Sequence, residues 1–83
     1  PKVLCFSKKE IDKEMFPFYN VEWICEWKND YVETIDWIKY SEVWIAESDF
    51  SYSETKTIKN LAKGKVIIAR NTNMLITKVG GNN

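Results

Sequence analysis

The chain contains no histidine, and this absence excludes several familiar kinds of chemistry. A Ser–His–Asp triad or a Cys–His pair needs an imidazole base, and a Cys/His metal site needs imidazole ligands. The two cysteines, Cys5 and Cys25, are too few for a disulfide framework. Both fall in strand-like runs, so we expect buried free thiols in a reducing cytosol. No metal or other cofactor is implied, and any catalysis would depend on carboxylates, hydroxyls, lysines or the amino terminus.

An excess of positive charge is also missing. Lysine and arginine total 12, aspartate and glutamate total 12, and Arg70 is the only arginine. Non-specific nucleic-acid binding depends on a basic surface, so nucleic acid is not the expected partner. Zero net charge gives little repulsion between copies, which favours self-association or a bound protein partner.

Long apolar runs are absent as well. The longest contain four residues, far shorter than a membrane-spanning segment or the apolar region of a signal peptide. We therefore expect a cytoplasmic protein with no membrane partner. A chain of 83 residues is long enough for one small domain, which we place at residues 1–83.

Apolar and aromatic residues supply the core and its strands. Hydrophobic residues make up 45% of the chain, including four Trp, four Tyr and four Phe. Three short apolar runs, at 3–6, 43–46 and 65–69, are typical of strands that are buried on both faces. In "VEWICEW", residues 21–27, apolar and charged residues alternate, which predicts a strand at the edge of a sheet.

Three segments between these runs have helical features. The stretch "SKKEIDKEMF" offers Ser7 as an N-cap and Glu10 three residues later, which together form a capping-box pattern, and Pro17 would end that helix. The stretch "NDYVETIDWIKYS", residues 29–41, repeats the pattern with Asp30 and Glu33. The residues expected to form the buried stripes of these two helices are Ile11, Met15 and Phe18 in the first, and Tyr31, Ile35 and Ile38, or Val32 and Ile35, in the second.

The third helical segment is "SETKTIKNLAKG". Ile58, Leu61 and Ala62 are expected to be buried, and Gly64 supplies the stop that helices commonly have at their carboxyl end. Behind the turn-forming "NTN", residues 74–79 predict one more strand.

Strands and helices alternate, which predicts a small three-layer α/β fold of the Rossmann-like type. Alternating apolar strands and helices form a mostly parallel sheet with helices on both faces. Because 21–27 has the character of an edge strand, we expect the flavodoxin-like strand order 2-1-3-4, with 74–79 as an additional antiparallel strand. The alternative is an α+β meander in which 21–27 and 74–79 pair as an antiparallel hairpin.

In an open parallel sheet, ligands bind beyond the carboxyl ends of the strands, at the point where the strand order reverses. With this order the loops at that point are 7–10 and 47–54. Each precedes a predicted helix, so its backbone N–H groups could hold an anion, although neither contains the glycine of a phosphate-binding loop. The alternative is that these residues only cap helices. The candidate ligand-binding residues are Ser7, Lys8, Lys9, Glu47, Asp49, Ser51 and Ser53.

The same loops supply three carboxylates, Glu47, Asp49 and Glu54. If burial or mutual repulsion raised the pKa of one of them, acid–base catalysis near neutral pH would follow. Alternatively, Glu47 and Asp49 are solvated loop residues and Glu54 completes a helix cap with Ser51.

Aromatic residues offer a different kind of site. Four tryptophans are difficult to bury completely in so small a domain, and Trp and Tyr are enriched at interaction surfaces. Trp23 and Trp27 share one face of the predicted edge strand at 21–27, and Tyr31 follows in the next segment. We expect these three residues to form a partly exposed interaction surface, whereas Trp44 belongs to the core. The alternative is that all of them are core residues.

The segment from about residue 38 to residue 70 resembles nucleoside 2-deoxyribosyltransferase-like proteins. The resemblance lies in "SEVWIAES" leading into a polar loop, in Ala62 of the following helix, and in the strand "KGKVII". It implies a Rossmann-like fold and a nucleoside or nucleotide pocket that could cleave N-glycosidic bonds. The catalytic glutamate of that family would fall near Thr57 or Ile58, where this chain has no acid.

Two hypotheses about function follow. In the first, the protein is a small non-catalytic binding module, an inhibitor or adaptor of the kind that phages and mobile elements carry, and acts through its aromatic surface. In the second, it binds or cleaves a nucleoside or nucleotide at loops 7–10 and 47–54.

Overall fold

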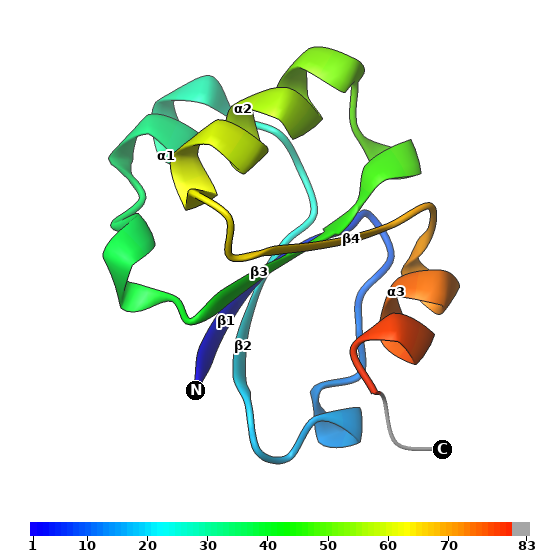
Figure 1. Ribbon diagram of the computed structural model, residues 1–83. Coiled ribbons are helices and arrows are strands. Elements are labelled where there is room, and N and C mark those ends of the chain that lie inside the picture. Colours follow the sequence, from blue (N-terminus) through cyan, green and yellow to red (C-terminus); the bar gives the residue numbers. More distant parts are fainter. Residues whose placement is uncertain (81–83) are drawn as a thin grey trace.

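A four-stranded, fully parallel sheet organises the protein, and its strand order is β2-β1-β3-β4 (Figure 1). The computed structural model describes residues 1–80. The strands are β1 (Lys2–Phe6), β2 (Asn20–Ile24), β3 (Glu42–Ala46) and β4 (Val66–Ala69). Both the α/β class and the 2-1-3-4 order agree with the sequence analysis. The meander alternative is wrong, because every strand pair is parallel.

The sheet is covered on both faces. The first face, as we call it, packs against the 11–19 segment and helix α3 (Thr72–Lys78), and the second face against α1 (Asn29–Thr34) and α2 (Tyr52–Ala62). On the first face the Trp44 ring packs against the rings of Phe16 and Tyr19, with centroid distances of 4.9 and 5.4 Å. Burial of such aromatic surface is a major source of stability in a small domain. Trp44 is a core residue, as predicted.

The two central strands are buried and the two edge strands differ from each other. All residues of β1 after Lys2 and of β3 after Glu42 are buried, as continuous apolar runs predict. Strand β2 is an edge strand, also as predicted, but it ends at Ile24, so the alternation does not extend to Trp27. The prediction of a doubly buried fourth strand is wrong: β4 is the other edge, and Val66, Ile67 and Ile68 are only half-buried.

Helix α2 has the ends that its sequence predicts. The Ser51 hydroxyl accepts the N–H of Glu54, and the Glu54 carboxylate accepts the N–H of Ser51, so the capping box forms. At the other end Lys63 and Gly64 have positive φ angles of 49° and 86°, and glycine adopts this conformation without strain. The prediction for Leu61 is wrong: it is 36% exposed, while Ile58 and Ala62 are buried.

The helix predicted to begin at Ser7 does not form. Residues 7–19 contain one short 3-10 turn, Lys13–Met15, whose N-cap is Asp12. Ile11 and Phe16 are buried on the first face, and Phe18, predicted to be buried, is 84% exposed. Ser7 is drawn into the interior by bonds to Trp23 and Lys9, so its hydroxyl does not cap a helix.

The helix predicted over 29–41 is much shorter in the structure. Helix α1 ends at Thr34, and a separate 3-10 turn follows at Trp37–Lys39. The N-cap of α1 is Lys28, so the capping box of Asp30 and Glu33 does not form. The Thr34 hydroxyl donates to the Tyr31 carbonyl, and β-branched residues such as Val32, Thr34 and Ile35 have weak helix propensity. The chain is extended at Ile35 and turns toward β3.

The predicted strand at 74–79 is a helix. Asn71 caps α3 by accepting the N–H of Met74 at 2.8 Å. Leu75 is buried, and Ile76 and Val79 pack beside it on the first face, a spacing that suits a helix rather than a strand. Within residues 1–80, no helix is long and apolar enough to cross a membrane.

Candidate functional site

The two loops predicted to form a site do meet at the carboxyl ends of β1 and β3. The backbone N–H of Lys8 donates to Oδ2 of Asp49 at 2.8 Å, which joins loop 7–10 to loop 47–54. The N–H of Ser48 donates to the Arg70 carbonyl at 2.9 Å and brings in the loop after β4. Lys9 Nζ lies 3.5 Å from Oδ1 of Asn73. Three connecting segments therefore converge at this end of the sheet.

Ser7, one of the candidate ligand-binding residues, belongs to the interior. Its hydroxyl donates to the Lys9 carbonyl at 2.8 Å, and the Trp23 indole N–H contacts both the Ser7 carbonyl and its hydroxyl, at 2.7 and 3.0 Å. The neighbouring Cys5 is also fully buried, and burial raises the pKa of its thiol to about 12. Ser7 fastens the end of β1 to β2, and the Cys5 thiol stays protonated and unreactive.

The three candidate carboxylates do not form one cluster. Glu47 borders a hollow of about 510 Å³ beside α2, together with Lys56 and Lys59. Asp49 borders a different hollow of about 290 Å³, whose other lining residues are Lys9, Asn71, Thr72 and Asn73. The Glu54 carboxylate is used in the helix cap, and Ser53 lies 3.2 Å from Ser51 at the same cap. Because Glu47 and Asp49 border separate hollows, the structure gives no support for a proton shared between them.

The predicted aromatic surface is divided between the two faces of the sheet. Trp23 packs at the border of the first face, whereas Trp27 packs against the second. The reason is that β2 ends at Ile24, so the strand alternation does not reach Trp27. Trp23 and Tyr31 do line a common shallow pocket with Cys25, which is half-buried rather than buried. The expectation that Trp23 and Trp27 share one face is wrong.

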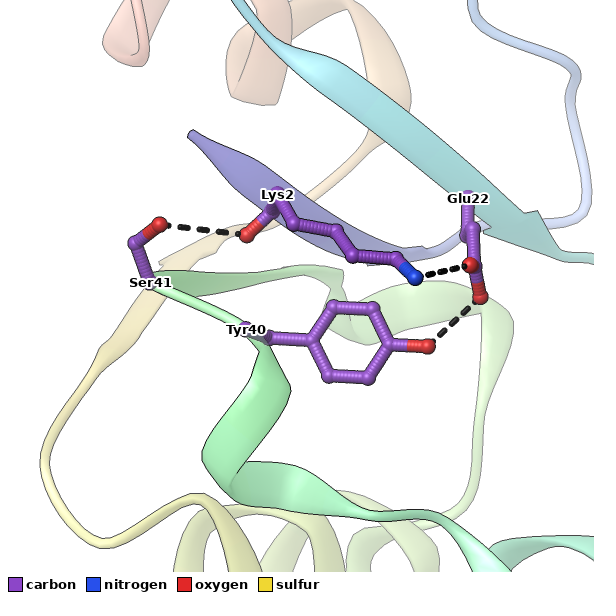
Figure 2. Close-up of polar contacts among 4 residues, drawn as sticks. All are labelled: Lys2, Glu22, Tyr40 and Ser41. Atoms are coloured by element: carbon purple, nitrogen blue, oxygen red, sulfur yellow. Dashed lines mark hydrogen bonds and ion pairs between the residues drawn. The ribbon is translucent and has the colours of Figure 1, made fainter.

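A polar cluster that the sequence analysis missed lies near the opposite end of the sheet, where β1 begins. Figure 2 shows Lys2 of β1 and Tyr40 both reaching the carboxylate of Glu22 in β2. The Tyr40 hydroxyl donates to Oε2 of Glu22 at 2.5 Å, and Lys2 Nζ lies 3.0 Å from Oε1. Ser41 donates to the Lys2 carbonyl through its N–H at 2.8 Å. These contacts tie the chain before β3 to the first two strands.

This cluster shifts the ionisation of two of its members. The hydrogen bond from Tyr40, reinforced by Lys2, holds the pKa of Glu22 below its usual value. Burial, together with the bond to Glu22, raises the pKa of Tyr40. Both shifts favour a neutral phenol that donates to a carboxylate. We assign the cluster a structural role, because both oxygens of Glu22 are already engaged within the chain.

An apolar hollow lies between the 3-10 turn at 37–39 and the carboxyl end of α2. It has a volume of about 470 Å³. Ile38 is 91% exposed, and Leu61 lies at the same site. Lys65 fixes the wall of the hollow, because its ammonium donates to the carbonyls of Trp37 and Tyr40 at 2.6 and 2.7 Å. The remaining lining residues are Asp36, Ala62 and Lys63.

This hollow was not predicted, because 29–41 was expected to form one long helix, with Ile38 on one of its two alternative buried stripes; Val32, on the other stripe, is the residue that is buried. The signal that could have revealed it is the run of β-branched residues that weakens the helix before Trp37. Within residues 1–80, no group of three or more His, Cys, Asp or Glu residues is arranged to hold a metal ion. No protein-family model matches the chain, and neither a curated protein nor a solved structure shows significant similarity to it.

Proposed function

We propose that this protein is a small non-catalytic binding module that recognises a partner protein through the apolar hollow formed by Trp37, Ile38 and Leu61. The observation that carries the proposal is the exposure of Ile38, an aliphatic side chain that is 91% exposed beside a half-buried tryptophan. Apolar side chains gathered around a hollow, with charged residues at the rim, are characteristic of interaction sites.

The rigidity of the hollow supports this function. Lys65 holds the backbone of Trp37 and Tyr40 with two charge-assisted hydrogen bonds, so the turn that presents Ile38 is fixed before a partner arrives. Preorganisation lowers the entropic cost of binding. The partner that suits this site offers a short apolar segment, such as one face of an amphipathic helix.

The test is to capture partners from the source cells on the immobilised protein and on two variants. Ile38→Asp places a charge at the centre of the hollow, and Phe18→Asp is the matched control, because Phe18 is also highly exposed but belongs to the segment on the other face of the sheet. We expect the partner to be lost with Ile38→Asp and retained with Phe18→Asp. Equal capture by both folded variants would contradict the proposal.

The resemblance to nucleoside 2-deoxyribosyltransferase-like proteins motivates a second candidate function, nucleoside or nucleotide binding at the carboxyl ends of the strands. The observation that favours it is the hollow of about 290 Å³ in which Lys9, Asp49 and Asn73 meet. A ligand that binds only the folded protein raises its melting temperature. A thermal-shift screen against nucleosides and mononucleotides tests this candidate, and no shift at millimolar ligand would exclude it.

A further inference from the structure

The outer edge of β4 is apolar and incompletely covered. Val66–Ala69 contains no polar side chain, and its first three residues are half-buried although the strand belongs to the sheet. A sheet edge carries unpaired backbone N–H and C=O groups, and proteins usually protect such an edge with charged side chains or a covering segment. Strand β4 has no protecting charge within its own sequence.

The hydrogen-bonding pattern shows which backbone groups face outward. The Lys65 carbonyl accepts the N–H of Val43 in β3, so in a parallel ladder the backbone of Ile67 also faces β3. The backbone groups of successive residues in a strand point to opposite sides, so Val66 and Ile68 direct their N–H and C=O groups away from β3, to the open side. The Lys78 ammonium of α3 donates to the Ile68 carbonyl at 2.8 Å, which agrees with that direction.

Helix α3 lies on the face of the sheet opposite to α2. Crossovers between parallel strands are right-handed, so a strand added beyond β4 would need its connecting helix on the second face, beside α2. Helix α3 packs instead on the first face, and Figure 1 shows α2 and α3 on opposite sides of β4. The right-handed rule therefore disfavours a strand reached directly through α3 as the occupant of this edge.

The charges around the edge indicate the occupant. Lys63 precedes β4, Arg70 follows it directly, and Lys78 touches its outer side; Lys63, Arg70 and Lys78 are all exposed. A second copy of the chain paired through β4 would bring these cations against each other. An acidic segment would instead be attracted to them.

We propose that the β4 edge binds an extended partner segment with an apolar centre and acidic flanks, which adds to the sheet as a fifth strand. The backbone of this segment exchanges hydrogen bonds with Val66 and Ile68. The Lys78 ammonium leaves the Ile68 carbonyl and pairs with a carboxylate of the segment. Apolar side chains of the segment then cover the half-exposed side chains of β4.

The test is an NMR titration of the ¹⁵N-labelled protein with synthetic peptides. The first peptide has a Val-Ile-Val centre with a pair of glutamates at each end, and the second has lysines in place of the glutamates. The third is the acidic peptide with N-methylated central amides, which cannot donate to a strand. We expect amide shifts centred on Val66–Ala69 with the acidic peptide alone, weakened as salt is added.

Three results would overturn the proposal: no shift with the acidic peptide at millimolar concentration, equal binding of the lysine peptide, or shifts confined to other elements. Self-association through β4 in sedimentation experiments, abolished by Ile67→Lys in a folded protein, would also overturn it, because the edge would then bind a second copy. Lys78→Gln should weaken binding of the acidic peptide about three- to fivefold, the effect of one exposed ion pair. Ile38→Ser, which adds no charge to the hollow that Lys63 also lines, should leave this binding unchanged, which separates the edge from the apolar hollow.

Discussion

The two edges of the sheet are built differently, although each is one strand at the border of the same parallel sheet. On the β2 edge, Val21 and Ile24 are buried. The two residues between them, Glu22 and Trp23, form side-chain hydrogen bonds with other parts of the chain. Trp23 is fixed to Ser7, and Glu22 is fixed by Tyr40 and Lys2. On the β4 edge, three consecutive aliphatic residues are half-exposed, and Lys78 reaches the strand from α3.

The two edges differ in how other parts of the chain cover them rather than in the strand propensity of their own residues. Both strands contain β-branched residues with good strand propensity. The β2 edge is covered on one side by the 11–19 segment and on the other by residues after the strand, including Trp27. The β4 edge keeps exposed apolar surface, and we therefore place the proposed strand-binding site there.

The largest expected effect comes from shortening one valine in each edge strand. Val21→Ala deletes two methyl groups at a position that is 3% exposed and should cost about 2 kcal/mol of unfolding free energy. Val66→Ala deletes the same groups from a half-exposed position and should cost about half as much, roughly 1 kcal/mol. Urea unfolding followed by circular dichroism measures both. Equal losses would show that the two edges are equally covered.

The indole of Trp23 should contribute more than the indole of Trp27. Trp23→Phe keeps an aromatic ring but removes the N–H that contacts the carbonyl and the hydroxyl of the buried Ser7, which should cost about 1–2 kcal/mol. In Trp27→Phe the lost partner is the exposed Asn29 side chain, and water can replace the bond at a cost of about 0.5 kcal/mol or less. Thermal unfolding of the two variants distinguishes these values, and the reverse order would refute the role given to Trp23.

The stability of the β2 edge should depend on pH through Glu22. Its pKa is lower in the folded protein than the ordinary value of 4.5, mainly because Tyr40 donates to its carboxylate. Its stabilising contribution is therefore complete above pH 4.5 and is lost as the pH falls through the lowered pKa. Glu22→Gln should unfold with a weaker acid dependence than the wild type, whereas Glu33→Gln, the charge-matched control on α1, should follow the wild type.

The Tyr40 phenol should make the stability of the folded protein depend on pH in the alkaline range. Its pKa is raised above the ordinary value of 10 in the folded protein, so the unfolded chain ionises first as the pH rises. The contribution of Tyr40 is complete below pH 10 and declines above it. Melting temperatures measured from neutral to alkaline pH should fall less steeply for Tyr40→Phe than for the wild type.

The smallest expected effect on stability comes from Lys78 at the open edge. Lys78→Gln removes an exposed ammonium from the Ile68 carbonyl, which water can then solvate, so we expect a change within about 0.5 kcal/mol. Chemical denaturation measures it. A loss of 2 kcal/mol or more would mean that Lys78 is an essential part of the folded edge rather than a removable cover.

Where sequence and structure disagree, local signals were overruled by packing. The Ser7 capping pattern and the Ser51 capping pattern look alike in the sequence, yet only Ser51 caps a helix. The Ser7 hydroxyl instead accepts a hydrogen bond from the indole of Trp23, which lies 16 positions away, so no local sequence pattern predicts the contact. Residues 74–79 complete a helix, with Val79 as its C-cap, although they include the β-branched Ile76, Thr77 and Val79, because Asn71 caps the helix and Leu75 is buried against the sheet. The convergence of loops 7–10 and 47–54 followed directly from the predicted strand order.

The sequence by itself determined the parallel sheet, its order and the end at which its loops converge. Continuous apolar runs, one alternating run and the spacing of helical segments favour this arrangement over an antiparallel meander, because strand burial and crossover handedness are strongly constrained. Only the tertiary structure decided that Glu47 and Asp49 line separate hollows, that Ile38 is exposed and that the two edges differ. These features depend on contacts between residues far apart in the chain, such as those of Lys65 with Trp37 and of Lys78 with Ile68, which side-chain periodicity does not encode.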